Sequence, residues 1–296
     1  MSTAAVGQAD SDVQQDWESG PTVPRMVLGA QLRRLREADG RSREDAGAAV
    51  RRPVEWISTL ELGRTRLRPR EVADLCAAYG VTDRAARATL LGLALQANAP
   101  GPWSGFQDVI PPWFEPYLEL EQSASVIRTY ETQAVSELLQ TGDYARAALG
   151  GRHPKRDVDR LVRLRLRRQD ILYRTRPVRL WAVIDEAALR RVCGGRSVAF
   201  AQLEHLIDVC GMANVTLQVL PLDAEPPGVG GGSFALLRPP EDELPDVVCV
   251  QRLNGALYPA EPAAVACYWH VMNRLVVRAA PARETPSILG RILHDL

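Results

Sequence analysis

The sequence predicts two folded domains: an all-α domain of five short helices over residues 27–98, and an α+β domain with a small, largely antiparallel sheet over residues 113–296. Three observations support this division. The 296 residues suffice for about two domains of ordinary size. Residues 97–105 are rich in proline and glycine, and residues 99–112 are the predicted linker. Helix start and stop signals dominate before this linker, whereas candidate strands and helices alternate after it.

The all-α domain is predicted from the residues that begin and end helices. Apolar residues with helical spacing begin at Val27, and Gly40 ends this stripe. Ser42 with Asp45 three residues later has the spacing of a capping box, and Pro53 precedes the next apolar run, as proline often does at a helix start. The five predicted helices cover residues 27–40, 43–50, 54–62, 69–79 and 82–98.

The α+β domain is predicted from β-rich segments that lie between helical ones, with the last strands antiparallel. Strands are expected at 125–130, 178–184, 215–220, 233–237, 247–251 and 256–258. Helices are expected at 155–173, 186–192, 199–211, 262–277 and 284–294.

The remaining composition favours a cytoplasmic protein without a membrane contact. Residues 1–26 are small, polar and acidic, which predicts a disordered tail and is unlike a signal peptide. No apolar run approaches the roughly 20 residues that a membrane span needs. The five cysteines are widely spaced and form no CxxC pair, so they indicate reduced thiols and no zinc site.

A formal net charge of zero hides zones of opposite sign. Residues 27–98 hold 13 arginines and 9 acids, residues 103–150 hold 2 arginines and 7 acids, and residues 152–179 hold 11 basic residues and 3 acids. The arginine-rich helix at 160–168 is expected to form ion pairs, either with the acidic zone at 115–143 or with a partner. Direct DNA contact by this helix is the alternative.

We find no catalytic set in the sequence, and the chain is not expected to be an enzyme or to bind a cofactor or metal. The glycine-rich segment at 228–233 lacks the Lys-Ser/Thr of a phosphate loop and leads into a strand, so a flexible connection is preferred. Asp185 and Glu186 could do acid–base work, but Asp185 is preferred as the N-cap of the next helix. The four histidines show no metal-ligand spacing.

Residues 42–62 predict a helix-turn-helix motif, because two short helices meet through a tight connection at 50–53. Gly47 lets the two helices approach closely, and Val50, Ile57 and Leu60 are spaced to face inward. In this motif the first residues of the second helix enter the major groove of DNA. The expected base-reading residues, which fall on the opposite face, are Val54, Glu55, Ser58 and Thr59.

The flanking residues are expected to bind phosphates. Ser42 and Arg43 stand at a helix N-terminus, where free N–H groups and the helix dipole favour anions. Arg64, Arg66 and Arg68 lie in the loop after the reading helix. Val54 and Thr59 are candidates for thymine methyl contacts. Glu55 has two open interpretations: it accepts a hydrogen bond from cytosine N4, or it repels phosphate.

The segments LGAQLRRLREADGRSREDAGAAV and VEWISTLELGRTRLRP together resemble the repressor and Cro type (Xre-like) of helix-turn-helix domain. This resemblance implies a structural role for Glu61, which should bridge to Arg33 or Arg36 of the first helix. It also implies a DNA-binding regulator that acts as a homodimer. The sequence departs from the family at residues 51–53, where Arg51 replaces the usual turn glycine; a positive φ there would cost about a kcal/mol.

The rest of the chain resembles the C-terminal domain of antitoxin-like and developmental transcriptional regulators of actinobacteria. The segments that carry this resemblance include WFEPYLELEQSASVIRTYETQAVSELLQTGDYARAAL, RLRLRRQDIL, VIDEAALRR, QLEHLIDVCGMANVTLQVLPLDA and GSFALL. It implies a partner-binding or signal-responsive domain, often with a small partner protein encoded nearby. The family's Val-Pro-Gly-Leu-Leu-Gln-Thr run is changed at residues 135–141, which should make that turn more helical.

The predicted function is therefore a sequence-specific transcriptional regulator that binds a double-stranded DNA operator through the helix at 54–62. The first alternative is an antitoxin-like protein–protein module whose main act is to bind a small partner. The second is a small-ligand sensor or enzyme, which only the size of the second domain suggests.

Overall fold

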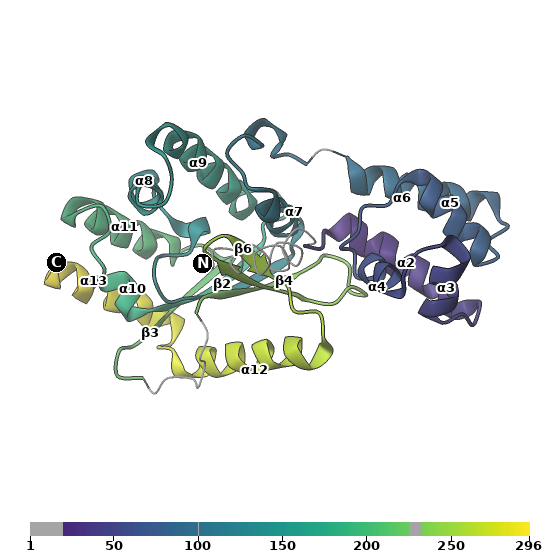
Figure 1. The fold of residues 1–296 in the computed structure, drawn as a ribbon. Coiled ribbons are helices and arrows are strands. Elements are labelled where there is room, and N and C mark those ends of the chain that lie inside the picture. Colours follow the sequence, from purple (N-terminus) through teal and green to yellow (C-terminus); the bar gives the residue numbers. More distant parts are fainter. Residues whose placement is uncertain (1–19, 100, 225–231) are drawn as a thin grey trace, which may run out of the picture.

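The computed structural model describes residues 20–99, 101–224 and 232–296, and Figure 1 shows their arrangement. The first domain contains the five predicted helices, which confirms the all-α prediction. Because Ser42 and Asp45 form both hydrogen bonds of a capping box, the second helix begins where the sequence indicates. The five helices are α2 (Val23–Ala38), α3 (Arg43–Val50), α4 (Val54–Glu61), α5 (Pro69–Ala78) and α6 (Arg84–Asn98).

Helix α2 belongs to two hydrophobic cores. Leu28 and Leu32 pack in the core of the helix-turn-helix domain, together with Ile57 and Leu60 of α4. Val23 and Met26, one turn earlier, pack in the core of the second domain. Because these apolar side chains and a proline at the first turn extend the helix, α2 begins at Val23, four residues before the predicted start at Val27.

The predicted tail and linker are thus partly folded. Residues 20–23 are buried, and residues 1–19 lie outside the described part of the chain. Within the predicted linker, Trp103 and Ile110 are 5% and 4% exposed and belong to the core of the second domain. The side chains of Trp103 and Ile110 therefore hold the linker against the second domain.

The second domain is built on one six-stranded sheet with the order β3-β2-β1-β4-β5-β6. The two pairings β1–β2 and β2–β3 are parallel, and the other three are antiparallel. The α+β prediction and the antiparallel last strands are confirmed, and all six predicted strands are present, but the sheet is mixed because β1, β2 and β3 pair in parallel. The strands are β1 (Val126–Glu131), β2 (Arg179–Asp185), β3 (Val215–Leu220), β4 (Phe234–Arg238), β5 (Val247–Arg252) and β6 (Gly255–Leu257).

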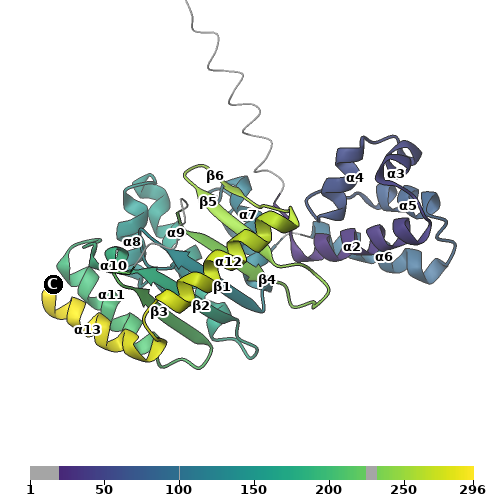
Figure 2. The same cartoon turned by 90° about the horizontal axis from the view of Figure 1, so that it is seen from below.

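Helices cover both faces of this sheet (Figures 1 and 2). Among the described helices, α12 (Pro262–Arg278) is the one that lies across one face, where Met272 and Leu275 are fully buried. The other helices line the opposite face and share the larger core. They are α7 (Glu115–Ser123), α8 (Gly142–Gly150), α9 (Lys155–Arg168), α10 (Glu186–Arg190), α11 (Arg196–Val209) and α13 (Thr285–Asp295). Short 3-10 turns include η2 (Pro112–Phe114) and η3 (Glu137–Leu139).

The arginines of α9 form ion pairs within the chain, as predicted, and most of their partners lie in the acidic zone at 115–143. Arg168 donates from Nε and Nη2 to the carboxylate of Glu121 at 2.7 and 2.8 Å, and from Nη1 to Glu137 at 2.5 Å. Arg165 also binds Glu137, and Arg160 binds Asp108. These contacts fasten α9 to α7 and to the 3-10 turn η3.

Among the described helices, none combines the length and the apolar character that a membrane-spanning segment needs. All five cysteines are free thiols. The glycine-rich segment at 228–233 lies outside the described residues except for Gly232 and Ser233.

Candidate nucleic-acid interface

The turn between α3 and α4 is tight. A Cβ at Gly47 would lie 2.6 Å from the carbonyl oxygen of Arg52, so the predicted close approach at Gly47 is confirmed. Arg51 closes α3 in the left-handed region, with φ 56° and ψ 43°. Arg51 therefore has the positive φ that was expected if it replaced the family's turn glycine. Because Arg51 carries a side chain, this backbone conformation costs about a kcal/mol of strain.

Helix α4 is held in place by its inner face. Ile57 and Leu60 are 0% and 1% exposed. Glu61 is buried and accepts from Arg36 Nε at 2.5 Å and Nη2 at 3.1 Å. This hydrogen-bonded partner raises the pKa of Arg36. The structural role of Glu61 is confirmed with Arg36 as its partner, whereas Arg33 pairs with Glu37 of its own helix.

The four proposed base-reading residues lie together on α4, away from this inner face. Glu55 is exposed, and Val54, Ser58 and Thr59 are half-buried. The Thr59 hydroxyl donates to the Trp56 carbonyl at 3.0 Å and lies 2.9 Å from the Thr65 hydroxyl. Since that hydroxyl already has partners, a methyl contact suits Thr59 better than a polar one.

The N-terminus of α3 is less free for phosphate than the sequence suggested. The Ser42 hydroxyl accepts from the Asp45 backbone N–H at 3.0 Å, and the Asp45 carboxylate accepts from Ser42 in return. These hydrogen bonds lower the pKa of Asp45, so a negative charge already stands at this helix end. Arg43 Nε donates to Glu61 at 2.9 Å, with its side chain 40% exposed.

The loop after α4 separates the three arginines predicted to bind phosphate. Arg64 Nη2 donates to the backbone carbonyl of Tyr258 in the second domain. Arg66 lies 4.0 Å from the carboxylate of Glu115, also in the second domain. Arg68 is exposed, and its backbone N–H donates to Glu71 at 2.8 Å. Arg68 is thus exposed, while Arg64 and Arg66 contact the second domain.

One residue of this surface was missed. The Arg52 guanidinium lies 5.1 Å from the centre of the Trp56 ring and 2.6 Å from a Glu71 oxygen. These two contacts hold the Arg52 side chain beside the start of α4. The sequence signal was the pair of Arg52 and Trp56 four residues apart, which is close enough for a cation–π contact.

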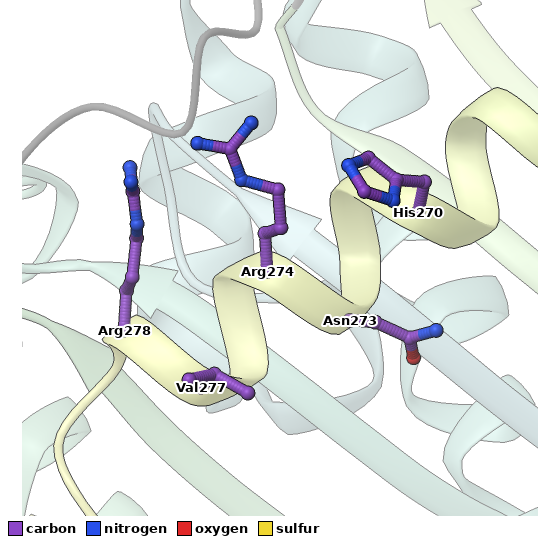
Figure 3. Close-up of a pocket in the computed structure, with 5 residues that line it drawn as sticks. All are labelled: His270, Asn273, Arg274, Val277 and Arg278. Carbon is purple, nitrogen blue, oxygen red and sulfur yellow. The ribbon is translucent and has the colours of Figure 1, made fainter.

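The second domain has a surface hollow of about 270 Å³ on α12, shown in Figure 3. His270, Arg274 and Arg278 project from this helix, and Asn273 and Val277 complete the lining. All five residues come from one helix, so within the described part of the chain the hollow has no convergent polar groups from several elements.

The two carboxylates weighed as acid–base candidates have structural partners. Asp185 caps α10 by accepting from the Ala187 N–H at 2.9 Å, which confirms the preferred N-cap role. Glu186 accepts from Arg190 at 2.7 Å on the same helix.

Comparison with known families agrees with this geometry. Residues 27–90 match a helix-turn-helix domain. Residues 114–291, more than half of the chain, match the family described as "Domain of unknown function (DUF5753)".

The chain belongs to the DUF5753 family.

The helix-turn-helix prediction is confirmed by the first match, which covers the whole α3–α4 unit and extends into α6. The DUF5753 domain corresponds to the sheet and its covering helices, from Phe114 through most of α13. Neither the curated proteins nor the solved structures gave a match to this chain.

Proposed function

We propose that this protein is a sequence-specific, DNA-binding transcriptional regulator that reads the major groove with α4. The observation that carries this proposal is the division of α4 into two faces. Ile57, Leu60 and Glu61 fix the helix to its domain, and Glu55 and Ser58 lie on the other face. A recognition helix needs this combination of a fixed backbone and accessible side chains near its N-terminus.

Each accessible residue has a proposed role. Val54 and Thr59 offer methyl groups to thymine, Ser58 offers a hydroxyl to a base edge, and Glu55 accepts from cytosine N4 or limits affinity by repelling phosphate. Arg68 and Arg43 bind backbone phosphates, together with the N-terminus of α3 at Ser42. Arg64 and Arg66 bind backbone phosphates once their contacts with Tyr258 and Glu115 of the DUF5753 domain are broken.

The test is to select binding sites from a random duplex pool and to measure affinity by fluorescence anisotropy at several salt concentrations. Arg68→Ala should weaken binding to all duplexes and reduce the slope of log K against log salt by about 0.9, the value of one phosphate contact. Arg84→Ala removes an equal charge at the exposed start of α6 and is the matched control. If both variants showed the same slope of log K against log salt, the proposal that Arg68 binds a phosphate would be wrong.

We further propose a cytoplasmic homodimer that binds two half-sites about 34 Å apart, since helix-turn-helix dimers place their reading helices one DNA turn apart. Light scattering of the purified chain and footprinting on the selected sites test this. A monomer on a single half-site would refute it. We also propose that the chain is an actinobacterial, Xre-like regulator. As an antitoxin-like protein it would also bind a small partner protein encoded nearby, and co-purification with that partner tests this binding.

A specific observation favours a second candidate function, the sensing of a small anion. A hollow of about 700 Å³ is lined by Arg174, Arg176 and Arg179, and no ion pair of the described residues includes these three. Arg174 donates to the carbonyls of Gln122 and Ala124, so its charge has no carboxylate partner there. Pyrophosphate should raise the melting temperature of the wild-type chain but not that of Arg176→Glu. We also propose that the protein is not an enzyme.

A further inference from the structure

The helix-turn-helix domain contacts the DUF5753 domain through residues that the proposed function assigns to DNA. Helix α2 leaves the second domain and runs into the first (Figure 2), where α4 packs against it through the shared core. Three arginines of the first domain meet oxygen atoms of the second: Arg64 at the Tyr258 carbonyl, Arg66 at Glu115 and Arg34 at Glu243. The oxygens come from three separate segments of the DUF5753 domain.

The loop that carries Arg64 is seated on a rigid support. Gly63 has φ +72°, and a Cβ there would lie 2.5 Å from the backbone nitrogen of Met26. Met26 is 6% exposed and belongs to the core of the DUF5753 domain. Gly63 thus rests on a residue that cannot move without disturbing that core, and the next residue, Arg64, points across the domain boundary.

The charges on the two sides are complementary. Glu115 and Glu119 stand on α7 of the DUF5753 domain and face Arg25 and Arg66. Burial raises the pKa of Glu119, and the charges of Arg25 and Arg66 act against this. These oxygen atoms attract the same guanidinium groups that would otherwise bind DNA phosphates, Arg64 through a hydrogen bond and Arg66 through an ion pair at 4.0 Å.

We propose that the DUF5753 domain restrains DNA binding by holding the helix-turn-helix domain through Arg34, Arg64 and Arg66, so that the interdomain contacts of Arg64 and Arg66 compete with DNA phosphates for the same guanidinium groups. This inference rests on the proposed DNA-binding function. It follows that any partner or ligand that loosens the contact at Glu115 and Tyr258 raises DNA affinity. By linkage, DNA loosens the same contact to the same extent in free energy.

The test uses the full chain with two substitutions, Glu115→Gln and Glu243→Gln, which keep side-chain size and remove both carboxylate charges. The control is Glu204→Gln with Glu261→Gln, an equal charge change at exposed positions on α11 and before α12. The probe is a random-sequence duplex, and anisotropy gives the dissociation constant. Exposed pairs contribute about 0.2–1 kcal/mol each, so affinity should rise roughly 2- to 30-fold in the first variant and more than in the control.

A second measurement does not depend on any variant. Hydrogen exchange of peptides that cover residues 112–119 and 255–262 should become faster when the wild-type chain binds DNA. Equal affinities of the two double variants, or exchange that is unchanged or slower, would overturn the restraint while leaving DNA binding intact. If the wild-type chain binds no duplex at all, the proposed function itself fails.

Discussion

The buried ion pairs of α9 give the sharpest prediction about stability. Arg168→Met removes one partner from a network in which the side chains of Arg168 and Glu121 are each only 2% exposed. It leaves the Glu121 carboxylate buried without its two hydrogen bonds of 2.7 and 2.8 Å, and it also removes the stacking of Arg168 over Phe114 and Tyr117. Breaking a buried pair in this way costs about 3–5 kcal/mol.

Urea unfolding followed by circular dichroism measures this cost. With a urea dependence of about 2 kcal/mol per molar, the midpoint of the DUF5753 domain should fall by roughly 1.5–2.5 M. Arg163→Met is the control, because it removes the same charge from an exposed position on the same helix. It should change the free energy of unfolding by less than about 0.5 kcal/mol. Similar midpoints for both variants would refute the reasoning.

Three further predictions concern turns, packing and pH. Arg51→Gly should stabilise the helix-turn-helix domain by about 1 kcal/mol in thermal unfolding, because glycine accepts the φ of 56° without strain; a lower melting temperature would contradict this. Gly47→Ala should destabilise by about 1–3 kcal/mol, since its Cβ would meet the backbone 2.6 Å away, whereas Gly92→Ala, with open space around it, should be neutral or stabilising. Burial opposes the ionisation of Glu137, but two arginines of α9 outweigh it and lower its pKa to about 2. The resulting stabilisation should be complete above about pH 4.5, the ordinary value, and should be lost as the pH falls toward 2; stability that stays flat across this window would count against it.

The local features of the first domain could be predicted because short-range chemistry determines them. The capping box at Ser42, the close approach at Gly47 and the inward spacing of Ile57 and Leu60 depend on residues a few positions apart. The bridge from Glu61 to Arg36 joins positions 25 residues apart, and resemblance to a known motif supplied it.

The contacts between domains could not be predicted in the same way. Nothing local to Arg64 indicates that its partner is the carbonyl of Tyr258, 194 residues later in the sequence. The polar composition of residues 1–26 predicts a tail, because Val23 and Met26 find apolar partners only in the folded second domain. The parallel pairing of β1 with β2 is also non-local, since helices α8 and α9 separate the two strands along the chain.

The central claim is that α4 reads bases, and binding-site selection with an altered reading face tests it most directly. The wild-type chain and the double variant Glu55→Ala with Ser58→Ala would be given the same random duplex pool at the same salt concentration. We expect the variant to lose base preference at neighbouring positions of each half-site while its affinity for random duplex stays within about threefold, because phosphate contacts are unchanged. Selection of the same sequence by both proteins would contradict the assignment of α4 as the recognition helix.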